Sequence, residues 1–159
     1  MYVIPTEENV INEFRGENNF LSNFYLRRVF YKGLLFPSVE HAYQASKGNS
    51  EFAKKIASLE KPVDAKKEAK LIALPENWEE NKIKIMADLI FLKFGLQNKD
   101  LRDKLANTQY KNIVEGNFWH DNFWGHCYCD RCKTIEKKNM LGQILMLMRE
   151  NILYVNKLK

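Results

Sequence analysis

The chain has 159 residues, of which 45% are hydrophobic and 13% aromatic, so we predict one globular domain over residues 1–159 with a well-buried core. No apolar run is long enough to span a bilayer, and the first residues lack the basic start and apolar block of a signal peptide, so we expect a cytoplasmic protein without a membrane partner. The net charge of +5 comes from intermixed basic and acidic residues, which favours anionic ligands such as phosphates without requiring a nucleic acid.

The first predicted elements are a strand over residues 10–14 and a hairpin over residues 25–36. The hairpin is expected to turn at Lys32 and Gly33, because β-branched and aromatic residues flank a glycine that tolerates positive φ. A short helix follows Pro37, with Ser38 as its N-cap.

This short helix carries a stripe of chemically active side chains. Glu40, Tyr43, Gln44 and Lys47 recur at spacings of three and four, which places them on one face. Glu40 lies in the first turn, where the helix dipole stabilises a carboxylate. Such a stripe is typical of a site rather than of a core. The adjacent His41 points about 100° away from Glu40, so a structural role is favoured over a catalytic one for this histidine.

Most of the elements predicted after this short helix are helices as well. Asn77 and Glu80 have the spacing of a capping box, and apolar residues at helical spacing follow them up to Gly95. The apolar positions of this helix are Ile83, Met86, Ile90 and Phe94. The other predicted elements are helices over 50–59, 62–72, 99–106 and 140–153 and a short strand at 113–114.

A long irregular segment over residues 115–138 is the second candidate for a functional region. Loops of this length inside a compact domain are usually functional. It holds two tryptophans, two histidines and Asp121, which favours a cleft wall on which a flat ring can stack. Trp124 is the preferred platform, because the following Gly125 allows backbone and ligand to approach closely.

All three cysteines lie in this segment, at positions 127, 129 and 132. Such close spacing is no framework for the disulfides of a secreted fold. Together with His126 they offer up to four soft ligands for zinc, but the second, distant pair of a strong zinc motif is missing. We therefore favour free thiols over a structural metal at this stage.

Several segments, in the same order, resemble the NADAR family, the YbiA-like N-glycosidases. The matching segments are Phe14–Gly16, Phe20–Phe24, Pro37–Lys47, Asn77–Trp78, Lys93–Phe94, Val114–Asn117, Trp119, Asp121, Phe123–Gly125 and Asn139–Arg149. The resemblance covers nearly the whole chain. It implies a helix-rich α+β single domain with a small antiparallel sheet.

The resemblance implies an N-glycosidase that hydrolyses the bond between C1 of a phosphorylated ribose and an exocyclic amine of a heteroaromatic base. Two substrate classes follow from it: phosphorylated intermediates of riboflavin synthesis, and ADP-ribose attached to guanine, either free or in single-stranded nucleic acid. The chemistry needs no cofactor and no metal. The oligomeric state is left open.

Glu40 is the first catalytic candidate, because a carboxylate stabilises positive charge developing at the anomeric carbon. The second carboxylate is Asp121, carried over from the family motif that ends in Trp-Gly, and it can supply a proton to the departing amine. Lys47 either holds phosphate or exchanges with the imine of a ring-opened glycosylamine. The expected substrate-binding residues are Arg15, Gly16, Phe20, Ser22, Asn23, Phe24, His41, Tyr43, Gln44, Trp119, Trp124, Gly125 and Asn139.

One departure from the family pattern affects substrate preference. Many members carry a Gly-Arg pair about ten residues before the Asn-Trp motif, where this chain has lysines at 66, 67 and 70. A lysine cannot reproduce the bidentate fork of an arginine on phosphate. Two other readings remain: a non-catalytic module that binds ADP-ribose or a nucleotide, and a nucleic-acid-binding protein, for which no known motif is present.

Overall fold

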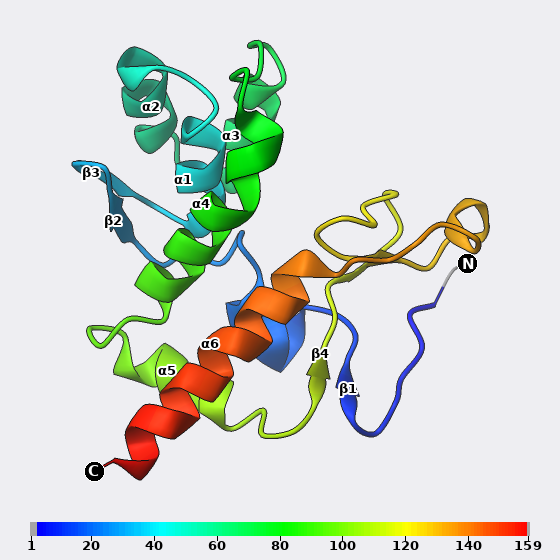
Figure 1. Cartoon of the computed structure of the whole chain (residues 1–159). Coiled ribbons are helices and arrows are strands. Elements are labelled where there is room, and N and C mark those ends of the chain that lie inside the picture. The colour runs from blue at the N-terminus through cyan, green and yellow to red at the C-terminus, as the bar shows by residue number, and fades with distance from the viewer. Residues whose placement is uncertain (1–2, 159) are drawn as a thin grey trace. The chain divides into compact units, whose positions relative to one another are not determined.

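The computed structural model describes residues 3–158 and divides into two compact units. The middle unit runs from Asn23 to Asn98, and the terminal unit is formed by the described residues before and after it. Six α-helices and three two-stranded sheets are present in the described residues (Figure 1). None of those helices is both long enough and apolar enough to cross a membrane.

The middle unit begins with a hairpin of β2 (Val29–Tyr31) and β3 (Leu34–Phe36), which pair antiparallel. Lys32 and Gly33 form its turn with φ of 47° and 82°, so both adopt the left-handed conformation that a tight hairpin turn requires. The predicted hairpin and its turn are therefore confirmed, although the paired part is shorter than expected.

Helix α1 (Val39–Ala45) lies at the centre of the middle unit. It contacts α2 (Ser50–Ala57), α3 (Pro62–Ala69) and α4 (Trp78–Lys93), and it also contacts the hairpin. Every residue of α1 is buried, including its polar ones. The predicted polar stripe is thus enclosed by protein on most sides.

Helix α4 differs from its prediction in two details. The Asn77 side chain makes no capping hydrogen bond, and the backbone carbonyl of Asn77 instead accepts from the amide of Asn81 at 3.2 Å. The predicted capping box is therefore wrong. Ile83 is 38% exposed, whereas Met86 and Ile90 are buried as predicted. The buried face of α4 also includes Lys93, a position that hydrophobic periodicity cannot reveal.

The terminal unit contains two parallel strand pairs, which were not predicted. β1 (Val10–Ile11) pairs with β4 (Asn112–Ile113), and β5 (Gly116–Asn117) pairs with β6 (His126–Cys127). The predicted antiparallel pairing is found in the β2–β3 hairpin of the middle unit. β1 is shorter than predicted, because the chain leaves it for the 3-10 helix η1 (Gly16–Leu21), which begins at a glycine with φ of 55°.

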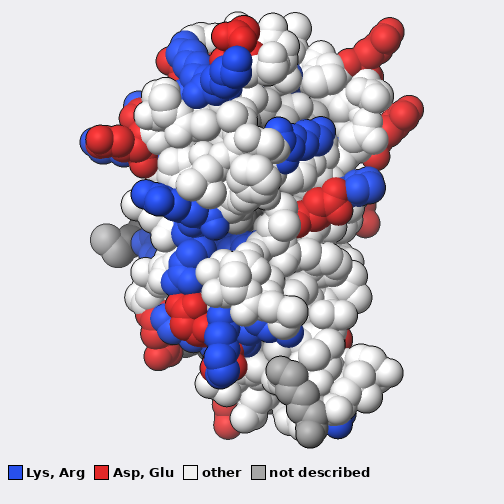
Figure 2. All heavy atoms as spheres, turned by 90° about the vertical axis from the view of Figure 1, so that its left-hand side faces the viewer, with Lys and Arg blue, Asp and Glu red and all other residues white. Residues whose placement is uncertain are grey.

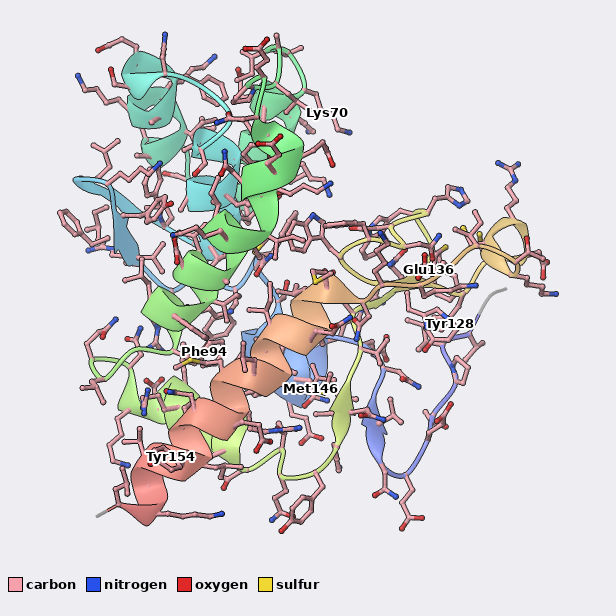
Figure 3. All side chains as sticks on the ribbon, viewed as in Figure 1. Lys70, Phe94, Tyr128, Glu136, Met146 and Tyr154 are labelled. Atoms are coloured by element: carbon pink, nitrogen blue, oxygen red, sulfur yellow. The ribbon has the colours of Figure 1, made fainter. Side chains whose placement is uncertain are left out.

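Helix α6 (Met140–Lys157) packs against α5 (Lys99–Ala106) and β4. Fully buried leucines from both helices form this core: Leu101, Leu105, Leu141 and Leu145. In the middle unit, the corresponding buried residue at the end of α4 is Phe94, which is labelled in Figure 3 and is fully buried. The predicted helices 99–106 and 140–153 are confirmed, the second with four further residues at its end.

Candidate active site

The N-terminus of α1 fixes the position of Glu40. The Ser38 hydroxyl accepts a hydrogen bond from the backbone amide of His41, which is the predicted N-cap. The amide of Glu40 donates to the carbonyl of Asn23 at 3.0 Å, so the turn that precedes the hairpin also holds the first turn of α1. Glu40 is only 7% exposed. The Glu40 carboxylate is therefore buried in the first turn of α1.

Gln44 orients this carboxylate from one turn further along. Its Nε2 donates to Oε1 of Glu40 at 2.7 Å, and both side chains are buried. The Oε1 of Gln44 has no hydrogen-bond partner among the described residues. Buried amide oxygens are normally paired, so this atom is available to a donor group of a ligand.

Lys47 completes the predicted stripe, just beyond the last residue of α1. Its ammonium group lies 5.2 Å from the ring centroid of Tyr43 and 5.4 Å from that of Trp78. The two rings are 5.2 Å apart and tilted by 58°. The lysine is therefore held in an aromatic corner next to the stripe, at cation–π distance. Trp78 packs in this corner as a buried residue rather than as an exposed stacking platform.

The charge of Lys47 is strongly influenced by its surroundings. Burial is the largest effect and lowers the pKa of its amine, while the Glu40 carboxylate acts in the opposite direction. Three further lysines lower the pKa again: Lys66, Lys70 and Lys82. Lys70, labelled in Figure 3, follows the end of α3. This concentration of positive charge around one carboxylate favours an anionic ligand such as a phosphate.

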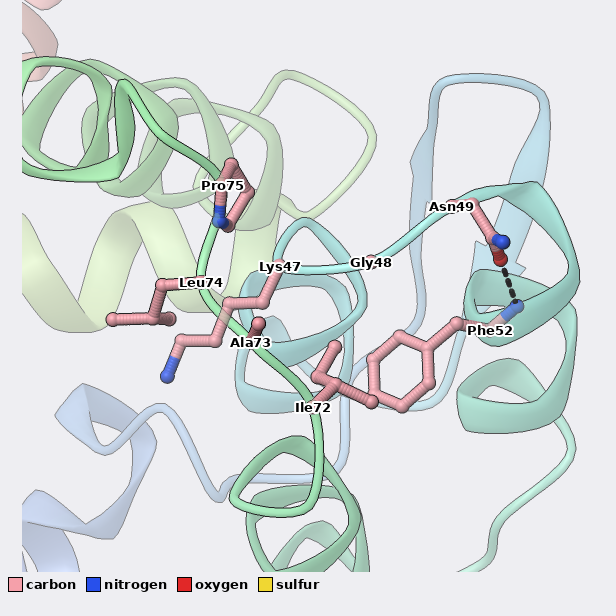
Figure 4. A pocket seen from close by; sticks show the side chains of 8 residues that line it. All are labelled: Lys47, Gly48, Asn49, Phe52, Ile72, Ala73, Leu74 and Pro75. Carbon is pink, nitrogen blue, oxygen red and sulfur yellow. Dashed lines mark hydrogen bonds between the residues drawn. The ribbon is translucent and has the colours of Figure 1, made fainter.

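A pocket of about 330 Å³ opens beside Lys47 (Figure 4). Its wall is largely apolar and includes Phe52, Ile72, Leu74 and Pro75. In Figure 4 the side chain of Lys47 extends in the direction of Leu74. The Phe52 ring lies beyond Ile72, on the side away from the Lys47 amine. The volume lies at the lower end of the range typical of small-molecule sites, so a small ring can be accommodated next to the amine.

His41 has a structural role in this arrangement. Its Nδ1 lies 2.7 Å from the Ser38 hydroxyl, and the residue is completely buried. Burial lowers the pKa of His41, an effect that the Leu59 backbone partly opposes, so the neutral imidazole is favoured. These contacts favour the structural alternative of the sequence analysis; a direct contact of His41 with substrate stays a prediction.

Lys93 is a further candidate functional residue that was not predicted, although it lies in one of the segments that resemble the family. Lys93 is completely buried in α4, and burial lowers the pKa of its amine to about 7. The Nζ lies 5.4 Å from the Tyr25 ring centroid and 5.3 Å from that of Phe94. A lysine with such a pKa can exchange a proton at neutral pH. In the sequence, the feature that could have indicated this role is a lysine on the otherwise apolar face of the predicted helix.

Asn23 and Phe24 lie in the same unit as the stripe. The carbonyl of Asn23 holds the Glu40 amide, its Nδ2 lies 3.4 Å from the sulfur of Met86, and its buried Oδ1 has no hydrogen-bond partner among the described residues. Phe24 is 40% exposed. Both positions are compatible with the predicted contacts to substrate.

Asp121 lies in the terminal unit and closes a tight turn there. Its Oδ1 accepts hydrogen bonds from the amides of Phe123 at 3.1 Å and Trp124 at 2.8 Å. The Nδ2 of Asn117 donates to the backbone carbonyl of Asp121 at 2.7 Å. These bonds give the carboxylate a fixed orientation and a structural function in addition to the predicted catalytic one.

The aromatic residues of this segment differ in their exposure. Trp119 is 57% exposed, whereas Trp124 is half-buried and packs edge-on against Phe123. Gly125 serves strand packing: a Cβ at this position would lie 2.2 Å from the carbonyl oxygen of Glu115. Glycine is therefore required at position 125 because the backbone of Glu115 approaches it closely.

The remaining predicted binding residues also lie in the terminal unit. Asn139 has φ of 45°, and its side chain pairs with the amide of Glu115 and the carbonyl of Ile113, so it anchors the loop before α6. Phe20 is buried and Ser22 half-buried, while Arg15 and Gly16 are exposed at the start of η1.

The structure thus brings the predicted residues together in two groups. Glu40, Tyr43, Gln44 and Lys47 form a contiguous cluster in the middle unit. Asp121, Trp124 and Gly125 share one turn in the terminal unit. The participation of both groups in one active site stays a prediction.

Comparison with known proteins agrees with these observations. The profile of the NADAR domain family matches residues 11–153. The chain is 30% identical over 147 residues to a riboflavin biosynthesis protein of Vibrio vulnificus, covering 85% of this chain but only 36% of that protein. It is 28% identical over 151 residues to the N-glycosidase YbiA of Shigella flexneri, covering 92% of this chain and 90% of that protein.

A solved structure is similar over almost the whole chain. The NMR structure of the E. coli protein YbiA matches with a TM-score of 0.77 and 27% sequence identity, covering 99% of this chain and 92% of that one. This similarity confirms the helix-rich α+β fold that the sequence predicted.

Proposed function

Because the chain belongs to the NADAR family, we propose that it is an N-glycosidase acting on a phosphorylated ribose joined to an exocyclic amine. The name of the Shigella relative supports the reaction class, and that of the Vibrio relative supports a substrate connected with riboflavin synthesis. The observation that carries the proposal is the buried cluster on α1, in which a carboxylate, its orienting amide and an amine lie together.

In the proposed reaction, the bond between C1 and the amine nitrogen breaks while water adds to C1. Positive charge develops on the ribose, and Glu40 stabilises it or takes a proton from the attacking water. The amine leaves with one proton added, so the products are the free base and a ribose bearing a hydroxyl at C1. Gln44 keeps the carboxylate of Glu40 in one orientation throughout.

Asp121 is proposed as the proton donor to the leaving amine. Its Oδ1 is engaged by the two amides of its own turn, which fixes the direction of the second oxygen. Trp124 follows within the same turn and is proposed to stack on the base.

Lys47 is proposed to bind the phosphate of the substrate. The surrounding lysines, Lys66 and Lys70 among them, strengthen the attraction for an anion. The same lysines lower the pKa of Lys47, which increases the fraction of neutral amine. This gives Lys47 a second candidate role as the nucleophile that exchanges with an imine. Borohydride trapping during turnover distinguishes the two: a covalent adduct on Lys47 requires the imine route, and its absence leaves phosphate binding.

Two substrate classes are proposed for this site. A ribosylamino-pyrimidine phosphate places one phosphate near Lys47, whereas ADP-ribose on guanine places two there. Both carry the scissile nitrogen outside a flat ring, so the same chemistry serves them.

The decisive experiment is mass spectrometry of the products after incubation with each substrate class. We expect the native protein to release the free base, and Glu40→Gln to reduce this rate at least about 100-fold, as loss of a catalytic acid or base does. Glu51→Gln is the matched control, because Glu51 is an exposed first-turn glutamate in α2. If calorimetry shows that the native protein binds a substrate, but mass spectrometry finds no product, the protein is instead a non-catalytic nucleotide-binding module.

A further inference from the structure

Four metal-binding side chains converge in the terminal unit, next to the turn that Asp121 closes. The Nδ1 or Nε2 of His120 and the sulfurs of Cys127, Cys129 and Cys132 all lie within 4.8 Å of one another. The three cysteines are buried and the histidine is exposed. Neither the proposed reaction nor its substrate contacts use any of the four.

The local backbone explains why the four side chains meet. Cys127 lies in β6, where its amide donates to Oδ1 of Asn122 at 3.0 Å. Cys129 precedes the 3-10 helix η2 (Asp130–Cys132), and its carbonyl accepts from the amide of Cys132 at 3.1 Å. His120 reaches the cysteines from the preceding turn with φ of 68°, a left-handed conformation that is uncommon for residues other than glycine.

The histidine of this cluster is not the one that the sequence pattern suggested. His126, adjacent to Cys127, instead stacks on Tyr128 with ring centroids 4.1 Å apart and planes inclined by only 6°. His120 lies seven positions before the first cysteine, a spacing that no common zinc motif contains. The zinc hypothesis of the sequence analysis is thereby corrected in its fourth ligand.

The separations between the four side chains match those of a tetrahedral zinc site. With Zn–S near 2.3 Å and Zn–N near 2.0–2.1 Å, a tetrahedron places its nitrogen and sulfur ligands about 3.6 Å apart. The Nδ1 of His120 lies 3.3 Å from the sulfur of Cys129 and 3.4 Å from that of Cys132. We propose that His120, Cys127, Cys129 and Cys132 bind one structural zinc ion.

The chemistry of the cluster also favours zinc over free thiols. Three thiols and one imidazole form a complete tetrahedral donor set, which leaves no open position for water or substrate. Among the described residues, the partly buried hydrophobic side chain that packs against these three cysteines is Phe118, so little apolar packing accounts for their burial. The ion would instead fix the segment that carries Asp121 and Trp124, as a structural site does when it stabilises an otherwise weakly packed loop.

The first test is elemental analysis of the purified native protein together with three variants. We expect one zinc per chain in the native protein, and loss of zinc in Cys129→Ser and His120→Asn. His126→Asn is the matched control, because it removes the neighbouring histidine without touching the cluster, and we expect it to retain zinc. Native protein without zinc, or zinc lost from His126→Asn but kept in His120→Asn, would overturn the assignment.

A second test uses the native chain and therefore does not depend on the folding of any variant. The three thiols should resist alkylation until a chelator is added, and circular dichroism should show whether the chain remains folded when they react. Cobalt added to the metal-free protein should give the thiolate-to-metal charge-transfer absorption of a tetrahedral sulfur site, and this band should weaken in His120→Asn. Rapid alkylation of all three thiols without chelator, combined with no cobalt spectrum, would show that they are free.

Discussion

At the scale of single residues, Lys93 is the most unusual group in the middle unit. Its amine is completely buried and its pKa is lowered to about 7 by burial, with a smaller contribution from Arg27. Long cationic side chains are rarely buried, because removing the charge from water is costly. The fold therefore loses stability at this position, and a function for the neutral amine would explain why a lysine is present.

We expect Lys93→Met to be more stable than the native protein at neutral pH. The folded pKa of about 7 lies below the ordinary value of 10.5, so the unfolded chain binds more protons between these values and native stability rises with pH across that window. The cost of the buried lysine at pH 7 is on the order of 4 kcal/mol. The advantage of the methionine variant should be largest near pH 7 and shrink toward pH 10.5.

Urea denaturation of both proteins across this pH range measures the effect. Lys67→Met serves as the control, because Lys67 is an exposed lysine of α3 in the same unit. A stability difference for Lys93→Met that does not change with pH would show that the amine is charged in the folded protein.

At the scale of elements, α1 depends on its N-cap to place Glu40. The Ser38 hydroxyl accepts from the His41 amide at 3.3 Å and lies 2.7 Å from the imidazole Nδ1, so one oxygen serves both the backbone and a buried side chain. Because α1 has only seven residues, each terminal bond contributes a large share of its local stability.

We predict that Ser38→Ala lowers the free energy of unfolding by about 1–2 kcal/mol, the usual cost of removing an N-cap, with His41 losing a partner as well. Equilibrium unfolding in urea measures this loss. Ser46→Ala is the comparison at the other end of α1, where the hydroxyl donates to the Ala42 carbonyl at 2.8 Å and caps no amide. Equal losses in the two variants would refute the capping role.

The strand pair β5–β6 gives a second prediction at this scale. In Gly125→Ala the added methyl group would meet the carbonyl oxygen of Glu115 at 2.2 Å, a backbone atom that cannot rotate away. We expect a loss of about 1–3 kcal/mol, the usual cost of inserting a methyl group into a closely packed site. Gly95→Ala is the control, because its methyl would meet only the flexible end of Gln97. Thermal unfolding of the two variants distinguishes them.

For the molecule as a whole, the basic excess is distributed among acidic side chains on the face that Figure 2 shows. Figure 2 shows a face on which lysine and arginine side chains occur together with aspartate and glutamate. Several exposed lysines are paired within their own helices, three or four residues from a carboxylate: Lys54, Lys84 and Lys99. The net charge of +5 is consistent with a general attraction for anions.

We therefore expect only moderate salt dependence if the substrate is a modified guanine in single-stranded DNA. Contacts to the lysine group around Lys47, four residues in all, correspond to a slope of about −3 in a plot of log affinity against log salt. Binding of such an oligonucleotide to the Glu40→Gln protein, measured by fluorescence anisotropy, gives this slope. A much steeper slope would show that further phosphates of the strand contribute most of the affinity.

The sequence by itself determined the elements and their boundaries where local signals are strong. The Lys32–Gly33 turn, the Ser38 cap and the helices at 99–106 and from 140 onward depend on residues close in sequence, and the structure confirms them. The stripe on α1 was predicted for the same reason, since helical spacing alone places its members on one face. The motifs that resemble the family were also sufficient to predict the fold class.

Only the tertiary structure decided the features that join distant positions or depend on burial. The parallel pairing of β1 with β4 unites residues about a hundred positions apart. The lowered pKa of Lys93 results from enclosure on every side, which no sequence pattern records. The choice of His120 over His126 beside the cysteines follows from a left-handed backbone turn and a ring stack. Local sequence fixes local conformation, but solvent exclusion and side-chain convergence arise only when the chain packs.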